Sequence, residues 1–290
     1  MKMEKLRACN LCESNELLLV DKNNNICQCK NCGFVFDNPR PTWEEIVSYY
    51  SRNDKYDSWL GELEERDLLW KRRLRLVKKY MKSGDLLDVG TGIGQFLFYA
   101  RNDFKVRGTE ISESAIAIAK EKYDMDVIKG EIEHINLDYN FNVITLFHVL
   151  EHVSNPSSTI MRCRELLKNG GILIIAVPND IVKFRLTVKR FLSIFKGSKP
   201  INFCKLGLTK LTLDGSQYDI HLSHFTPSVL QGFLERNGFV ISKITLDPYY
   251  VARGIKKVYH DLLYFSCLIV MKILRINLYF TTWIVAKNIK

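Results

Sequence analysis

The sequence predicts an α/β protein with a doubly wound, mostly parallel sheet of seven strands and a small cysteine-rich module at its N-terminus. From residue 85 onward, short apolar runs alternate with Gly-rich turns and helical segments, a pattern typical of parallel sheets covered by helices on both faces. Five of the eight cysteines fall within the first 32 residues. The composition, 47% hydrophobic and 26% charged, excludes a wholly disordered or fibrous chain.

The cysteine-rich module contains two Cys-x-x-Cys pairs separated by sixteen residues, and Gly33 follows the second pair where a tight turn is needed. This spacing predicts a four-thiolate zinc site made by Cys9, Cys12, Cys29 and Cys32. Four protein ligands leave no open coordination position, so we expect a structural zinc. Cys27 is an alternative ligand, but only Cys29 and Cys32 repeat the spacing of the first pair.

The cysteine pattern also bears on location. Residues 1–10 contain no apolar stretch of the kind found in signal peptides, and the longest apolar run, residues 262–271, is shorter than the ~20 residues that span a bilayer. Metal-bound thiols fit a reducing compartment better than a disulfide framework does. We therefore expect a cytoplasmic protein, with peripheral contact at the inner face of a membrane as an open alternative.

Three segments follow from the breaks in the pattern. Two prolines at positions 39 and 41 interrupt regular structure, so we expect the zinc ribbon to occupy residues 1–42. Residues 43–84 form a helical connector, with a helix at 62–82 that ends at Ser83-Gly84. The α/β domain occupies residues 85–290 and carries basic, apolar insertions at about 181–220 and 254–278.

Within the α/β domain, strands are expected at residues 86–89, 105–110, 127–129, 142–147, 172–177, 240–246 and 283–286. Helices are expected at 95–101, 112–123, 156–168, 225–237 and 255–276. Ser112 caps the second of these helices, and Thr226 caps the fourth, with Pro227 at its first position. In such a sheet, ligands bind at the carboxyl ends of the strands, near the point where the strand order reverses.

A glycine-rich turn follows the first strand. Asp88 precedes a Gly-x-Gly-x-Gly sequence at positions 90–94, and Glu110 ends the second strand, twenty residues after Gly90. Glycines allow a ligand to approach the backbone closely, and an acid at the end of the second strand can accept hydrogen bonds from ribose hydroxyls. A dinucleotide-binding turn would need a glycine at position 95, which is Gln95. The site therefore suits a nucleoside without a pyrophosphate.

These motifs carry a resemblance. Residues from about 85 to 247 resemble a class I S-adenosylmethionine-dependent methyltransferase of the ubiquinone-methyltransferase-like branch, through the segments 87–94, 106–112, 147–153, 166–171 and 177–179. The resemblance implies that S-adenosylmethionine is bound by Asp88, Gly90, Thr91, Gly92, Gly94, Glu110, Ile111, Glu131 and Phe147. Glu131 stands where this family usually has an acid near the adenine.

The ribbon, followed by Asn-Pro-Arg-Pro at positions 38–41, resembles methyltransferases encoded among surface-polysaccharide genes. This resemblance implies a small-molecule or glycan acceptor in polysaccharide biosynthesis. We expect methylation of an acceptor oxygen, with methylation of carbon or nitrogen as the alternatives. An RNA methyltransferase and a non-catalytic scaffold with the same fold are the alternatives. The intact Asp88, glycines and Glu110 argue against the scaffold.

Histidines form a second candidate site. His148 ends the fourth strand, where its side chain could take a proton from an acceptor hydroxyl, so it is the expected catalytic base. Alternatively, His148, Glu151, His152 and His224 could hold Mg²⁺ or Mn²⁺. The acid and the histidines could also be purely structural. The literal His-x-x-Glu-His pattern of an inverted zinc-peptidase lacks the long helix that such a site requires.

The last third of the chain is basic. Residues 181–290 carry 17 Lys and Arg against 5 Asp and Glu, and within them apolar residues interrupt the basic ones. The segments 181–213 and 254–278 therefore predict either a homodimer interface or a peripheral membrane contact. Nucleic acid is a less suitable partner because the basic residues do not form a polar groove.

Overall fold

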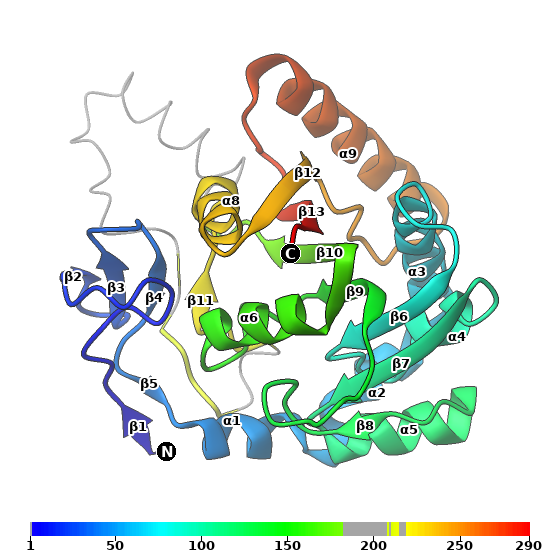
Figure 1. Cartoon of the computed structure of the whole chain (residues 1–290), viewed down its shortest axis with the longest axis horizontal. Coiled ribbons are helices and arrows are strands. Elements are labelled where there is room, and N and C mark those ends of the chain that lie inside the picture. Colours follow the sequence, from blue (N-terminus) through cyan, green and yellow to red (C-terminus); the bar gives the residue numbers. More distant parts are fainter. Residues whose placement is uncertain (1, 182–207, 209, 215–218) are drawn as a thin grey trace.

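The computed structural model describes residues 2–181, 208, 210–214 and 219–290. Its centre is a seven-stranded sheet in the order β12-β13-β10-β9-β6-β7-β8 (Figure 1). The strands are β6 (Gly84–Val89), β7 (Phe104–Glu110), β8 (Ile128–Lys129), β9 (Phe141–Phe147), β10 (Leu167–Pro178), β12 (Phe239–Thr245) and β13 (Thr281–Asn288). Only β13 opposes its neighbours, so the predicted doubly wound, mostly parallel sheet is confirmed.

Helices cover both faces of this sheet. One face packs against α3 (Leu63–Val77), α4 (Gln95–Ala100) and α5 (Glu113–Tyr123), and the other packs against α6 (Pro156–Leu166) and α8 (Pro227–Arg236). Successive strand residues alternate between the two cores: Val143 belongs to one cluster and Ile144 to the other. This alternation follows from the two-residue period of a strand, and it requires both faces to be apolar.

The helix caps agree with the sequence-based expectations. Ser112 accepts a hydrogen bond from the amide of Ala115, and Thr226 accepts one from the amide of Val229. Several boundaries differ. The helix expected at 62–82 ends at Val77, and α6 ends at Leu166 rather than at residue 168, where β10 begins at once with a register shift. The side-chain amide of Asn288 donates to the carbonyl oxygens of Arg164, Leu167 and Lys168, which satisfies acceptors at the end of α6.

The N-terminal module is a small sheet in the order β11-β4-β3-β2, formed by β2 (Leu17–Asp21), β3 (Ile26–Cys29), β4 (Val35–Asp37) and β11 (Ser223–His224). Outside this sheet, β1 (Met3–Glu4) pairs with β5 (Arg40–Pro41). The fourth strand therefore comes from the α/β domain, and the ring of Phe34 packs 5.1 Å from that of Phe225. The predicted boundary near residue 42 divides the chain but does not separate the two parts in space.

The connector consists of α1 (Trp43–Tyr50), a 3₁₀ turn at Asn53–Tyr56, α2 (Asp57–Gly61) and α3. Trp70, Leu74 and Val77 of α3 belong to the same core cluster as Phe96 and Ile174. The connector is thus an integral layer of the fold rather than a linker.

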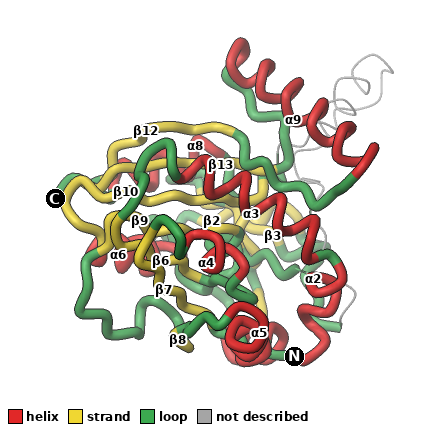
Figure 2. Tube along the Cα trace, turned by 90° about the vertical axis from the view of Figure 1, so that its right-hand side faces the viewer, coloured by secondary structure: helices red, strands yellow, loops and turns green. Residues whose placement is uncertain are grey.

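Two further regions complete the chain. The helix α9 (Gly254–Leu274) joins β12 to β13 and lies at the outer edge of the molecule (Figures 1 and 2). Most of the insertion expected at 181–220 lies outside the described residues. Across the described residues, none of the helices combines the length and the apolarity that a bilayer-spanning segment needs.

Candidate active site

A pocket opens at the carboxyl ends of β6, β7 and β9, under the connector helices. Of the sequence-predicted site residues, its lining includes Gly90, Thr91, Gly92, Glu110, Ile111, Glu131, Phe147 and His148. Asp88 and Gly94 are not among the lining residues. The reversal of strand order between β6 and β9 lies at this pocket, as the topology of a doubly wound sheet requires.

The glycine turn forms one wall of the pocket. Gly90, Gly92 and Gly94 have φ of 66°, 57° and 76°, a left-handed conformation that side chains rarely adopt. A Cβ atom on Gly90 would meet Cγ2 of Val149 at 2.6 Å, so this position has no room for a side chain. The turn therefore brings backbone rather than side chains to the pocket surface.

Glu110 ends β7 at the wall beside this turn. One carboxylate oxygen accepts a hydrogen bond from the amide of Gly92 at 2.8 Å, and the other accepts from the amides of Ile111 and Ser112 at 2.8 and 3.0 Å. Each oxygen has two acceptor sites, so the carboxylate can still accept from a ligand hydroxyl. Burial raises the pKa of Glu110. The residues present fit the nucleoside end of S-adenosylmethionine, because the wall combines a glycine turn without side chains and a buried carboxylate.

Asp88 lies behind the turn. Its carboxylate accepts a hydrogen bond of 2.6 Å from the hydroxyl of Thr145, and burial raises its pKa to about 7. Gly94 is the N-cap of α4. Both residues shape the turn from beneath, so contact between either of them and a cofactor stays a prediction.

The connector supplies a further part of the lining, which sequence reasoning did not anticipate, and one of its residues lies against the glycine turn: a Cβ atom on Gly92 would meet Cζ3 of Trp59 at 2.9 Å. Tyr50, Tyr56, Trp59 and Arg66 line the pocket, and the guanidinium of Arg66 lies 3.6 Å from the centroid of the Trp59 ring. The run of aromatic residues between positions 43 and 59 was the available signal. Their role became visible only when α1 and α2 packed over the strand ends.

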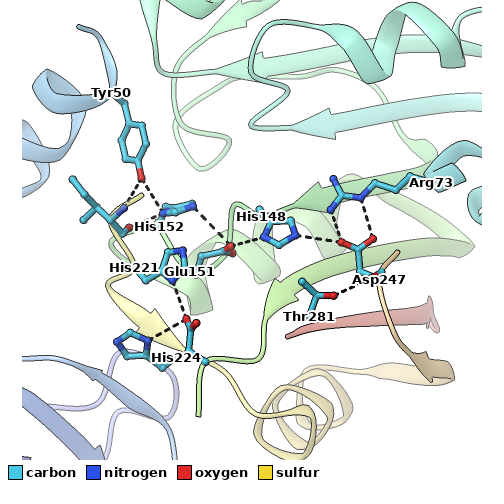
Figure 3. A network of polar contacts seen from close by, with 11 residues as sticks. Tyr50, Arg73, His148, Glu151, His152, His221, His224, Asp247 and Thr281 are labelled. Atoms are coloured by element: carbon cyan, nitrogen blue, oxygen red, sulfur yellow. Dashed lines mark hydrogen bonds and ion pairs between the residues drawn. The ribbon is translucent and has the colours of Figure 1, made fainter. Parts of the chain in front are cut away.

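His148 lies between two carboxylates (Figure 3). Its Nδ1 is 3.2 Å from Glu151 Oε1, and its Nε2 is 3.2 Å from Asp247 Oδ2. Burial alone would lower the pKa of His148, but hydrogen bonds to Asp247 and Glu151 outweigh burial and raise it. Because the pKa of His148 is raised and both of its ring nitrogens face carboxylates, His148 is less available as a base than the sequence predicts.

The carboxylate of Asp247 also pairs with Arg73, which is almost fully buried. His148 has φ of 58°, a strained conformation for a residue other than glycine, and its amide donates to the carbonyl oxygen of Ala176. The result is a charge chain, Arg73–Asp247–His148–Glu151, in which positive and negative groups alternate.

His152 has a different environment. Its Nδ1 donates to the carbonyl oxygen of Ile220 at 2.6 Å, because that oxygen can only accept, and the hydroxyl of Tyr50 lies 3.0 Å from the same nitrogen. Burial lowers the pKa of His152, so the neutral form is favoured. Its Nε2 then carries the lone pair and lies 3.8 Å from Glu151 Oε1, within the pocket lining.

The expected metal set of His148, Glu151, His152 and His224 does not converge on one point. Instead, ligand atoms of Glu151, His152 and His221 lie within 4.8 Å of one another, as do those of Asp180, His221 and His224. His224 is held by Asp37 of β4 at 2.9 Å. His221 is therefore the residue that sequence reasoning missed, although the sequence His221-x-x-His224 was its signal.

The cysteine cluster meets the geometric requirement for zinc. The Sγ atoms of Cys9 and Cys32 are 3.7 Å apart, and those of Cys12 and Cys29 are 3.6 Å apart. A tetrahedral ion with Zn–S bonds of ~2.3 Å separates its sulfurs by roughly 3.8 Å. Cys27 lies outside the cluster, and its Sγ faces the carbonyl oxygen of Asn38 at 3.8 Å.

Comparisons with known proteins agree with this architecture. The sequence profile of a methyltransferase domain family matches residues 62–244. An uncharacterized protein of Methanocaldococcus jannaschii is 29% identical over 126 residues, which are 43% of this chain and 58% of that protein. A ubiquinone biosynthesis O-methyltransferase of Coxiella burnetii is 28% identical over 145 residues, which are 47% of this chain and 62% of that enzyme. The chain thus spans about three fifths of the length of these relatives.

Among solved structures, the magnesium protoporphyrin IX methyltransferase of Synechocystis PCC 6803 with bound SAH superposes with a TM-score of 0.52. The superposition covers 84% of this chain and 97% of that one, at 14% sequence identity, and it therefore bears on the fold. The profile match covers more than half of the 290 residues, and the strand order, glycine turn and acid are in place. The chain accordingly belongs to this methyltransferase domain family, with the fold of class I S-adenosylmethionine-dependent methyltransferases.

Proposed function

We propose that the chain transfers a methyl group from S-adenosylmethionine to an oxygen atom of a small-molecule or glycan acceptor, with His152 as the general base. The observation that carries this proposal is the position of the His152 imidazole, whose pKa is lowered by burial, in the same pocket as the glycine turn and Glu110. The proposal moves the base from His148 to His152.

S-adenosylmethionine supplies an electrophilic methyl group on a sulfonium. The backbone at Gly90–Gly92 and the carboxylate of Glu110 would hold its nucleoside end. Nε2 of His152 would take the proton of the acceptor hydroxyl and so make its oxygen a better nucleophile toward that methyl group, which would leave the sulfonium as a neutral thioether. Glu151, whose pKa is lowered by its ion pair with His148 despite burial, stabilises the imidazolium that forms on His152. Positioning of the two reactants supplies much of the remaining rate enhancement.

The pocket lining supports a small acceptor. Aromatic rings of Trp43, Tyr50, Tyr56 and Trp59 line the pocket, and such rings pack on the flat apolar faces of compact ligands. A matched relative is named as an O-methyltransferase, which favours an oxygen acceptor. The resemblance of the zinc ribbon to proteins of surface-polysaccharide clusters favours a sugar among the candidates.

A divalent metal is the alternative way to activate the acceptor. Glu151, His152 and His221 could hold Mg²⁺ or Mn²⁺ within the pocket, since all three line it. In that case His152 would be a ligand rather than a base. The two roles make opposite predictions for chelation.

The test compares turnover and cofactor affinity in two variants. His152→Ala should lower turnover by roughly 10²–10⁴-fold and leave the affinity for S-adenosylmethionine nearly unchanged. His134→Ala is the matched control, because His134 is 77% exposed and lies outside the pocket lining. Full activity of His152→Ala on an acceptor that the native chain methylates would overturn the assignment.

The pH profile separates His152 from His148. A base with a lowered pKa is deprotonated above that value, so turnover should fall only as the pH drops through a value below ~6.5. Were His148 the base, the acid limb would lie above ~6.5, because its pKa is raised. Loss of activity on chelation, reversed by Mg²⁺ while the zinc content is unchanged, would favour the metal instead.

A further inference from the structure

The helix α9 exposes a continuous apolar face. Its large exposed side chains include Ile255, Val258, Tyr259, Leu262, Phe265, Ile269 and Ile273, with exposed fractions between 55% and 87%, besides Leu274 at the end of the helix. We call these seven residues the α9 apolar face. Isolated exposed apolar residues are normal on a protein surface, but a contiguous set along one helix marks an interaction site.

The spacing of these residues places them on one side of the helix. Their positions advance by three or four residues per turn, so at 100° per residue they fall within about one third of the circumference. Among the residues that fall in this sector of α9, Ser266 is the polar exception. The opposite side is anchored, because Leu263, Tyr264 and Cys267 pack with Leu246 and Tyr279. The α9 helix therefore presents apolar residues both to the body of the protein and to its surroundings.

The charges around this face are predominantly positive. Lys256, Lys257 and Lys272 lie on the helix, and Arg253 and Arg275 flank it. The acid of α9 is Asp261, which pairs with Lys257 at 2.6 Å and accepts a hydrogen bond from Tyr250. Arg253 pairs with Glu64. Among the described residues, no ion pair is recorded for Lys256, Lys272 or Arg275, which are all exposed.

We propose that the α9 apolar face lies in the interface of a membrane that contains anionic lipids. The helix would lie in the membrane plane, with its apolar side chains among the acyl chains and its lysines at the headgroups. This arrangement uses both features of the helix, the apolar face and the unneutralised positive charge, and the interfacial position suits the amphipathic ring of Tyr259.

Charge decides between a membrane and a second copy of the chain. If two α9 helices packed face to face in an antiparallel arrangement, Lys256 of each copy would approach Lys272 and Arg275 of the other. In a parallel arrangement, like residues would meet. Both arrangements bring positive charges together, whereas anionic headgroups neutralise them. A dimer through this face is therefore an outcome that the experiment must be able to reveal.

The test measures binding of the full-length chain to sedimented vesicles. The vesicles contain phosphatidylcholine alone or phosphatidylcholine mixed with phosphatidylserine. We expect binding to the mixed vesicles that weakens as salt is added. The triple variant Leu262→Ser, Phe265→Ser, Ile269→Ser should bind at least ~10-fold more weakly. The double variant Leu18→Ser, Leu19→Ser is the matched control, because these apolar residues are similarly exposed on β2, and it should bind like the native chain.

A charge variant tests the lipid preference. Lys256→Glu combined with Lys272→Glu should remove the preference for phosphatidylserine, whereas Lys79→Glu combined with Lys105→Glu, two exposed positions away from α9, should keep it. Circular dichroism and thermal unfolding establish that each variant is folded. Absence of native binding, or equal loss in the controls, would overturn the proposal. A concentration-dependent dimer that is abolished by the α9 triple variant, without vesicle binding, would overturn it in favour of a second copy.

Discussion

Folded proteins usually bury apolar side chains and expose charged ones. The pocket and the α9 helix each depart from this rule, in opposite ways. The pocket buries charged groups, since Arg73 and Asp247 are almost wholly enclosed and Glu151 is 1% exposed. The α9 helix exposes apolar groups, with Ile255 at 87% and Ile273 at 72%. A folded protein without ligands gains little stability from either arrangement.

The difference lies in what compensates each arrangement. The buried charges compensate one another within the chain, through the alternation from Arg73 to Glu151, so the structure already contains their partners. The apolar residues of α9 have no such internal partner on their outer side. Polar groups buried in pairs point to chemistry inside the fold, whereas unpaired apolar groups point to a surface outside it.

The largest expected effect concerns the predicted zinc site, where the sulfurs of four cysteines lie close together. Cys29→Ser should abolish zinc binding, because the binding free energy of a structural zinc is roughly 10–16 kcal/mol and depends on all four thiolates. Cys27→Ser should retain one zinc per chain, since its Sγ lies outside the cluster. Metal analysis of the two purified variants makes the comparison. The reverse result would transfer the ligand role to Cys27.

The next effect tests whether the charges in the pocket depend on one another. Arg73→Met should lower the free energy of unfolding by about 3–5 kcal/mol, because Asp247 would lose its cationic partner in a buried environment. The control is Arg52→Met, which breaks an exposed pair with Asp54 and should leave the free energy of unfolding nearly unchanged, because solvent screens exposed ion pairs. Denaturant titration measures both. Equal losses in the two variants would mean that burial does not distinguish these pairs.

A smaller effect is expected at the cofactor wall. Glu110→Gln replaces the carboxylate that is expected to accept hydrogen bonds from the ribose with a neutral amide. The free energy of binding S-adenosylmethionine should therefore weaken by about 1–3 kcal/mol. Glu113→Gln serves as the control, because Glu113 is exposed and lies outside the pocket lining. Calorimetry of both variants would contradict the assignment if Glu110→Gln bound the cofactor as tightly as the native chain.

The smallest effect is expected on α9. Leu262→Ser and Phe265→Ser should each change the free energy of unfolding by less than about 0.5 kcal/mol, because neither side chain is buried in the fold. Leu246 follows β12 and is buried against the anchored side of α9. Leu246→Ala should therefore lower the free energy of unfolding by about 2–5 kcal/mol. Thermal or denaturant unfolding provides the measurement. A large loss at Leu262 would show that the outer face contributes to folding and is not held for a partner.

Local features of this chain were predictable because their causes are local. The two-residue period of the strands, the capping residues Ser112 and Thr226, and the glycine turn at 90–94 depend on neighbours a few positions away. The four cysteines were also predictable, because a tetrahedral metal imposes a recurrent spacing on its ligands. These patterns were sufficient for the fold class.

Only the tertiary structure decided which groups face one another in the pocket. Asp247 lies 99 positions from His148, and its approach depends on the placement of β12 and α9 beyond β13, which no local pattern encodes. The pairing of Asp37 in the ribbon with His224 depends on β11 joining the ribbon sheet. A pKa is set by burial and by such distant charges, so the sequence could nominate His148 as the base, whereas the tertiary surroundings raise the pKa of His148 and lower that of His152.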